Sequence, residues 1–258
     1  MSAIGDAYSS GATAWADGPT RVYGRLADLL VAFSPAPLTG RTVLDLGSGT
    51  GTGSRAARDA GAAAIVAADL AFGMLLVGRE ARPPAAVGNA VALPFRREAF
   101  DVVLAPFSLN HLSDPAAGVR EAGRVGRSLL ASTYAADDDH PIKAAVEQAL
   151  AEVGWQRPSW YGDIKEAMAA WGSVDGATDA IERGGMRPVH VRHEEIAFPE
   201  LTPTEMAGWR LGLAQSSGFF EALDPATQAA VVARSVELLG PRPTPVVRRV
   251  IFLSAEAP

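Results

Sequence analysis

The residues with the clearest capacity for chemistry lie where a short apolar run ends in a glycine-rich turn. Gly47, Gly49 and Gly51 alternate in that turn, so the backbone can adopt positive φ and a ligand can approach it closely. Asp45 stands two positions before the first glycine, and its carboxylate suits a cationic ammonium group better than a pyrophosphate. The turn therefore predicts a site for an adenosine-type ligand with a positively charged arm.

The same spacing argues against a nicotinamide dinucleotide. The fingerprint Gly-x-Gly-x-x-Gly/Ala would place Thr52 at its third small position, where a β-branched side chain would push the following helix off the strand. Residues 43–46 read as a buried parallel strand, and a helix is expected over 54–60. A strand, glycine turn and helix form the first unit of a doubly wound α/β fold, whose ligand lies beyond the carboxyl ends of the strands.

Residues 43–53 resemble motif I of the class I S-adenosylmethionine-dependent methyltransferases, in the form Val-Leu-Asp-Leu-Gly-Ser-Gly-Thr-Gly. Three later segments agree with that family in order, namely 65–75, 88–95 and 100–115. The match covers roughly residues 40–134 and is general to ubiquinone and menaquinone methyltransferase-like proteins. It implies an α/β, Rossmann-like doubly wound sheet of seven mostly parallel strands, with an antiparallel edge strand and a helical lid.

The resemblance also implies a cofactor, S-adenosyl-L-methionine. Asp69 ends the second expected strand, where the family's acidic residue holds both ribose hydroxyls. Asn89 stands where the family more usually has Asp, and its carbonyl can still accept from the adenine amine. The full set of expected cofactor-binding residues is Asp45, Gly47, Ser48, Gly49, Gly51, Asp69, Leu70, Met74, Asn89, Ala90 and Pro106.

Methyl transfer from a sulfonium is an in-line displacement, so it depends on placing the acceptor and needs no metal or covalent nucleophile. A hydroxyl acceptor would need a general base, and His111 is the best placed histidine because it follows the fourth expected strand. His111 could instead cap a helix or brace the loop. Tyr134, at the end of the fifth expected strand, could hydrogen-bond the acceptor or simply pack in the core.

The other histidines have weaker claims to a catalytic role. His140 follows the acidic run 137–139, a spacing compatible with a proton relay or a metal site, although such a run is usually solvated surface. His190 and His193 share one face of an expected strand without a recognisable ligand spacing, so structural roles are expected.

The chain is expected to form a single domain over 1–258. It divides into an N-terminal helical arm (1–39), a cofactor-binding core (40–134) and two helical insertions (135–171 and 200–245) that form a substrate lid. The insertions hold many of the aromatic residues, as a lid over a bulky apolar acceptor would require.

Two further expectations concern the ends of the core. The segment 8–19 resembles the family's flexible arm, and Tyr8, Trp15 and Tyr23 could shield the sulfonium by cation–π contact or pack as filler. Residues 188–198 and 246–254 are expected to form an antiparallel pair at the sheet edge, where the arginines 248–249 would be tolerated.

Composition narrows the partners. The net charge of -6 and the pI near 5.3 disfavour nucleic acid, and there are no cysteines. No run is long enough to cross a bilayer and no leader is apparent, so a cytoplasmic protein is expected, with a homodimer as one possibility.

The expected function is methyl transfer to an O, N or C atom of a small, fairly apolar molecule, either quinone-like or from secondary metabolism. The alternatives are a non-methylating cyclisation or elimination on the same fold, and a non-catalytic binding module that regulates through the cofactor. A disabled cofactor site would mark the last of these, yet Asp45, Asp69 and the glycines are all present.

Overall fold

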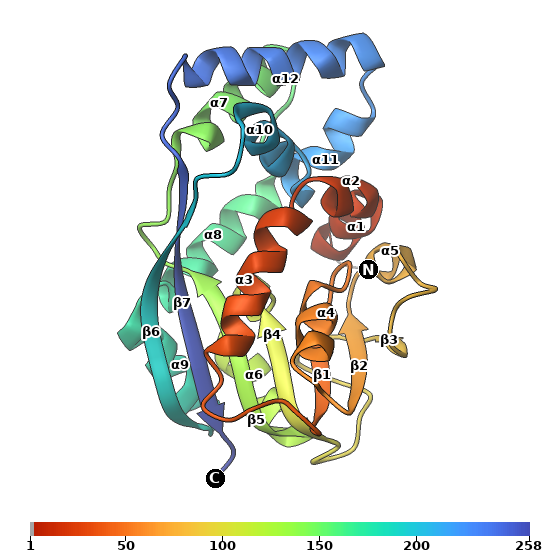
Figure 1. The fold of residues 1–258 in the computed structure, drawn as a ribbon, viewed down its shortest axis with the longest axis vertical. Coiled ribbons are helices and arrows are strands. Elements are labelled where there is room, and N and C mark those ends of the chain that lie inside the picture. The colour runs from red at the N-terminus through yellow and green to blue at the C-terminus, as the bar shows by residue number, and fades with distance from the viewer. Residues whose placement is uncertain (1–2) are drawn as a thin grey trace.

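A seven-stranded sheet organises the chain, with strand order β3-β2-β1-β4-β5-β7-β6 (Figure 1). The computed structural model describes residues 3–258, apart from the side chains at 163, 166, 167, 169 and 170. The strands are β1 (Thr42–Leu46), β2 (Ala64–Asp69), β3 (Ala85–Val87), β4 (Phe100–Pro106), β5 (Gly126–Tyr134), β6 (Arg187–Phe198) and β7 (Val246–Glu256). The first five run parallel, and β7 is antiparallel to both β5 and β6. The predicted doubly wound architecture is confirmed.

Helices cover both faces of the sheet, and alternate strand residues feed two cores. The helices α3 (Thr20–Ala32) and α4 (Thr52–Asp59) lie on one face, whereas α6 (Pro115–Val125) and α9 (Val174–Arg183) lie on the other (Figure 1). In β4, Val102 and Leu104 join the core beneath α3, whereas Val103 and Ala105 join the core beneath α6. A strand that is buried on both faces has a continuous run of apolar residues, so these central strands could be predicted from the sequence.

The antiparallel pair at the sheet edge is confirmed, but its edge strand is β6, and β7 lies one strand further in. The expectation that both arginines of β7 would sit on an edge is therefore wrong. Arg248 is buried and pairs with Asp138, and Arg249 pairs with Glu195 of the true edge strand. A buried guanidinium needs such a partner because its desolvation is costly.

The N-terminal segment expected to be a flexible arm is folded into two helices, α1 (Ala3–Ser10) and α2 (Ala12–Asp17). It docks on α5 (Phe72–Leu76), where the backbone N–H of Gly73 donates to Ser9 Oγ at 3.2 Å. A Cβ at Gly73 would lie 2.2 Å from the Ser9 carbonyl oxygen, so only glycine allows this approach.

The two insertions hold helices that stand beyond the carboxyl ends of the parallel strands (Figure 1). They are α7 (Pro141–Ala151), α8 (Ser159–Trp171), α10 (Pro203–Leu211), α11 (Ala214–Glu221) and α12 (Pro225–Leu239). Leu150 of α7, Trp209 of α10 and Val231 of α12 belong to the same core cluster as the first face of the sheet. Within residues 3–258, no helix combines the length and the apolar character needed to span a bilayer.

Replacing Gly73 by alanine tests the docking of the N-terminal helices. The added Cβ collides with backbone of α1, so we expect faster amide hydrogen exchange over residues 3–17 with unchanged exchange in β1 and β4. Gly208→Ala in α10 is the control, because nothing lies within 4 Å of its added Cβ. Exchange over 3–17 that matches the wild type in Gly73→Ala would show that the close contact does not hold the arm.

Candidate active site

A cavity of about 690 Å³ opens at the carboxyl ends of the parallel strands and extends beneath the inserted helices. Its volume lies within the range of about 300–1,000 Å³ that is usual for small-molecule sites. Most of the residues expected from the sequence line it, namely Gly47, Ser48, Gly49, Asp69, Leu70, Met74, Asn89, Ala90, Pro106, His111 and Tyr134. Asp45 and Gly51 do not.

The glycine turn forms one wall of this cavity. Gly47 has φ +68°, and a Cβ there would lie 2.2 Å from Ser108 Cβ in the loop after β4. The N–H groups of Gly47 and Ser48 donate to the Ala68 carbonyl of β2 at 2.8 and 3.0 Å. Gly51, at φ +100°, is the N-cap of α4. The turn therefore depends on glycine both for its conformation and for close contact with the neighbouring loop.

Asp45 lies behind the turn rather than in the cavity. Its Oδ2 accepts from the backbone N–H and the hydroxyl of Ser54, both at 2.6 Å, which fixes the first turn of α4. Burial raises the pKa of Asp45 to about 6, although the Ser54 hydrogen bonds oppose that shift. The carboxylate faces α4 close to Gly53, and its Oδ1 has no hydrogen-bond partner among residues 3–258.

Asp69 lies in the cavity wall at the end of β2, and backbone donors fix its position. Its Oδ2 accepts from the Gly49 N–H at 2.7 Å and its Oδ1 from the Ala71 N–H at 2.8 Å. Each carboxylate oxygen keeps a further lone pair. Burial raises the pKa of Asp69, and the backbone hydrogen bonds act in the opposite direction. The geometry leaves two oriented acceptors available to a diol.

Arg82 braces the turn, and the sequence contained no motif that would have marked it. Its Nη2 donates to the carbonyls of Gly49 at 2.8 Å and Met74 at 3.0 Å, and its Nη1 lies 3.3 Å from Ser48 Oγ. Burial lowers the pKa of Arg82. An arginine in an irregular loop is normally a solvated side chain, so only the fold reveals this role.

Asn89 lies exposed at the cavity rim, after β3. Its Oδ1 accepts from the Val91 N–H at 3.1 Å, which closes a tight turn and still leaves one lone pair on that oxygen. Leu70 is also exposed, whereas Met74 is buried beside the arm helix α2.

His111 meets the N-terminal arm across the cavity. It ends the short 3₁₀ helix η1 (Leu109–His111), and its Nε2 lies 3.1 Å from the Tyr8 hydroxyl. Its Nδ1 has no hydrogen-bond partner within residues 3–258. Burial lowers the pKa of His111 to about 4, so the ring is neutral at neutral pH. A neutral imidazole can accept a proton, but a pKa of about 4 lies well below neutral pH and makes His111 a weak general base.

An aromatic wall lines the cavity between α3 and the carboxyl ends of β4 and β5. Tyr23 packs edge-on against Phe107 at 5.3 Å between ring centroids, and Phe107 lies 4.5 Å from Tyr134. Trp15 packs on Tyr23 at 4.8 Å. All four line the cavity, so Tyr134 is a wall residue and not merely core filler.

Phe107 is a site residue that the sequence did not identify. It has φ +53°, a conformation that costs a non-glycine residue about 1–3 kcal/mol. Its N–H donates to the Ser132 carbonyl at 3.1 Å, and this contact with β5 helps to hold the strained backbone. The strain turns the chain directly after Pro106 and sets the ring in the cavity.

The acidic run after β5 differs from its expected solvated state. The side chain of Asp138 is buried and pairs with Arg248, whereas Asp137 and Asp139 are exposed. His140 caps α7, since its Nδ1 accepts from the Ile142 N–H at 3.2 Å. Over the part of the chain that the structure describes, no three His, Asp or Glu side chains are grouped to hold a metal ion.

Comparison with known proteins agrees with this geometry. A family model described as a methyltransferase domain matches residues 44–128. The demethylmenaquinone methyltransferase of Renibacterium salmoninarum is 32% identical over 188 residues, which covers 68% of this chain and 77% of the relative.

Two solved structures share the fold. The cyclase SpnF has a TM-score of 0.53 at 20% identity, covering 91% of this chain and 80% of that one. Phosphoethanolamine N-methyltransferase 2 of Haemonchus contortus, in complex with S-adenosylhomocysteine and phosphomonomethylethanolamine, also has a TM-score of 0.53, at 17% identity over 90% of this chain and 52% of that one. The Renibacterium relative, the family model and the fold together show that the chain belongs to the class I S-adenosylmethionine-dependent methyltransferases.

Proposed function

We propose that this enzyme binds S-adenosylmethionine in the cavity and methylates an O, N or C atom of a small, fairly apolar acceptor of quinone-like or secondary-metabolite type. One observation carries the proposal. A glycine turn, the carboxylate of Asp69 with two free acceptor positions, and an aromatic wall all line the same cavity. The name of the Renibacterium relative, a demethylmenaquinone methyltransferase, favours a quinone-like acceptor.

In this proposal each side chain has a distinct task in holding the cofactor. Asp69 accepts from both ribose hydroxyls, and Asn89 with Ala90 receives the adenine. The backbone of Gly47–Gly49 meets the amino-acid arm, with Ser48 beside it, and Leu70, Met74 and Pro106 supply apolar contacts. Asp45 and Gly51 act indirectly, by fixing the turn and the start of α4.

When bound, the cofactor supplies a methyl group on a sulfonium. Tyr8, Trp15 and Tyr23 line the cavity and would shield a cation by their ring faces. The aromatic wall aligns a planar acceptor, and alignment is the main requirement of an in-line displacement. For a hydroxyl acceptor, His111 takes the proton and Tyr134 orients the ring. The inserted helices serve as the lid that excludes water.

The direct test of function is product formation. The protein is incubated with S-adenosylmethionine and a panel of hydroquinones, phenols and arylamines, and S-adenosylhomocysteine is measured with the methylated product. We expect both to form in equal amounts with at least one acceptor. Cofactor binding with an acceptor altered but not methylated would instead indicate a cyclase or eliminase, and binding with no turnover across the panel would favour a regulatory module.

Asp69→Ala tests the cofactor site. Losing two charge-assisted hydrogen bonds to the ribose should weaken S-adenosylmethionine binding about 10- to 100-fold in isothermal titration. Asp175→Ala is the matched control, because this exposed aspartate on α9 lies outside the cavity lining and should leave affinity unchanged. An Asp69→Ala dissociation constant equal to that of the wild type would refute the assignment.

The buried neutral state of His111 predicts a pH dependence of stability. Its pKa is lowered from 6.5 to about 4 in the folded protein, so between these values the unfolded chain binds a proton that the folded chain does not. The free energy of unfolding should therefore fall as pH decreases from 6.5 towards 4. His111→Gln should flatten this slope, whereas the exposed control His190→Gln should not. Parallel slopes in the wild type and His111→Gln would contradict a buried neutral imidazole.

A further inference from the structure

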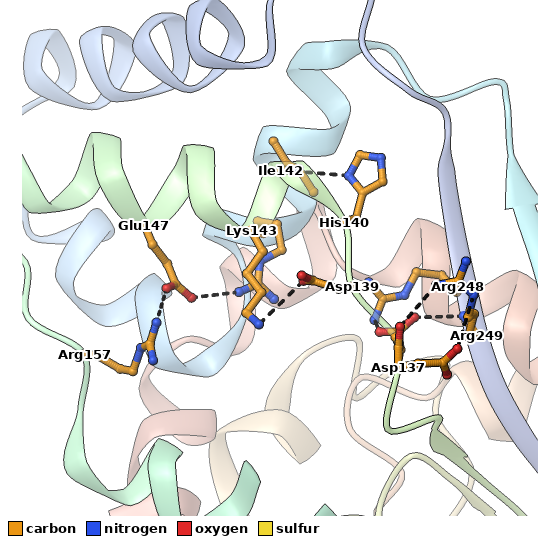
Figure 2. Close-up of polar contacts among 11 residues, drawn as sticks. Asp137, Asp139, His140, Ile142, Lys143, Glu147, Arg157, Arg248 and Arg249 are labelled. Atoms are coloured by element: carbon orange, nitrogen blue, oxygen red, sulfur yellow. Dashed lines mark hydrogen bonds and ion pairs between the residues drawn. The ribbon is translucent and has the colours of Figure 1, made fainter. Parts of the chain in front are cut away.

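The far end of the cavity, beyond the aromatic wall, is rich in cationic side chains. Four of them line it, namely Lys143, Lys165, Arg210 and Arg248, against two lining carboxylates, Asp138 and Asp139. Figure 2 shows Lys143 beside Asp139 and Arg248 on β7, with the ion pairs that join these elements. Arg210 forms an ion pair at 3.5 Å with a further carboxylate, that of Glu147, which lies outside the cavity lining.

Two of these cations are deeply buried. The side chain of Arg248 is 8% exposed and that of Arg210 is 9% exposed. Arg248 stacks over the rings of Tyr134 at 4.3 Å and Trp209 at 4.6 Å. Lys165 is more exposed, and burial with the neighbouring charges of Lys143 and Arg210 lowers its pKa to about 8. Counting Glu147, four cations face three carboxylates at this end of the cavity, so one further anion would be favoured there.

Several buried hydrogen-bond donors at the same end remain without acceptors. Across residues 3–258, no partner is found for Arg210 Nε, Arg248 Nε, Trp209 Nε1 or Gln215 Nε2. All four residues line the cavity, whereas the four donor atoms themselves are covered by neighbouring atoms. Leaving a buried donor unpaired typically costs about 1–3 kcal/mol, and polar groups of this kind are usually satisfied by a ligand or water.

We propose that the methyl acceptor carries an anionic oxygen group, a carboxylate or its equivalent, which binds at this end between Arg210 and Arg248. A carboxylate accepts about four hydrogen bonds and matches the arginine fork. A neutral quinone carbonyl could satisfy one donor but would leave the cationic excess unbalanced. This inference rests on the proposed function, because it treats the cavity as the acceptor site.

The aromatic wall fixes where the anion lies relative to the reacting atom. Arg248 stacks on Tyr134, Tyr134 packs on Phe107, and the next residue, Ser108, contacts Gly47 of the cofactor turn. The anionic group therefore lies across the aromatic wall from the turn. An aromatic acid whose methylated atom and acid group are on opposite ends of the ring system fits this arrangement.

The test compares acids with their own neutral methyl esters. The full chain is first saturated with S-adenosylhomocysteine. Hydroxybenzoic and hydroxynaphthoic acids are then titrated into it, alongside the methyl esters of these acids. The corresponding phosphate monoesters are titrated in a separate series. We expect at least one acid to bind about tenfold more tightly than its ester. A preference for the phosphates alone would assign the site to a phosphorylated acceptor. Equal affinity of acids and esters, or no acid binding at millimolar concentration, overturns the proposal.

Arg210→Gln and Arg157→Gln form a matched pair of variants. Both remove one ion pair to Glu147, but Arg157 is 55% exposed and outside the cavity lining, whereas Arg210 lines it. Arg210→Gln should abolish the preference for acids, and Arg157→Gln should keep it. Equal loss in both variants would overturn the proposal, because the effect would then be structural.

Two further measurements separate other causes of failure. Lys165→Gln, a change at an exposed side chain, should reduce the acid preference even where Arg210→Gln proves unstable. An unchanged preference in Lys165→Gln together with an unfolded Arg210→Gln would count against the anion site. Cofactor affinity is titrated separately, so failure to bind S-adenosylmethionine would refute the proposed function, whereas normal cofactor binding without acid preference refutes only this inference.

Discussion

The structure depends on the close approach of three backbone segments at the carboxyl ends of β1, β2 and β4. Gly47 lies against the loop that follows β4, and Asp69 at the end of β2 accepts from the Gly49 N–H at 2.7 Å. A side chain at Gly47 would separate the turn from Ser108, and the cavity wall would lose its shape. Because parallel strands end together, this single packing constraint gathers Asp69, the glycine turn and the aromatic wall around one cavity.

The core and much of the candidate site could be predicted from the sequence because local pattern determines them. Apolar runs followed by glycine or aspartate mark strand ends in a doubly wound sheet. The resemblance to the methyltransferase family then singled out Asp69 and Asn89 after two of these strands, and both line the cavity. Asp114 before Pro115 is a typical helix start, and in the structure the Asp114 side chain accepts from the Ala116 N–H at the first turn of α6. These signals lie within a few residues of the atoms that they position.

The residues that the sequence missed act through contacts between distant segments. Arg82 reaches back to the carbonyl of Gly49, and Phe107 owes its strained backbone to the contact with β5. The hydrogen bonds from Ser54 of α4 to Asp45 were also missed, because the sequence pattern does not show which helix residues meet a strand side chain. The buried pair of Asp138 with Arg248 was missed for the same reason, since each residue alone is typical of solvated surface.

The two parts of the cavity lining come from different parts of the chain. The core supplies a turn and a carboxylate that are general to the fold, whereas the insertions and β7 supply Arg210, Trp209 and Arg248, which define the far end. Fold alone does not specify the reaction, so in the proposed function these side chains select the acceptor. The N-terminal helices complete the enclosure by bringing Tyr8 to His111.

The most direct test of this account is a crystal structure of the protein with S-adenosylhomocysteine. The account predicts the ribose hydroxyls on the two oxygens of Asp69, the amino-acid arm along the Gly47–Gly49 backbone, and the sulfur facing the wall formed by Tyr23, Phe107 and Tyr134. A ligand bound elsewhere, or a ribose turned away from Asp69, would contradict it.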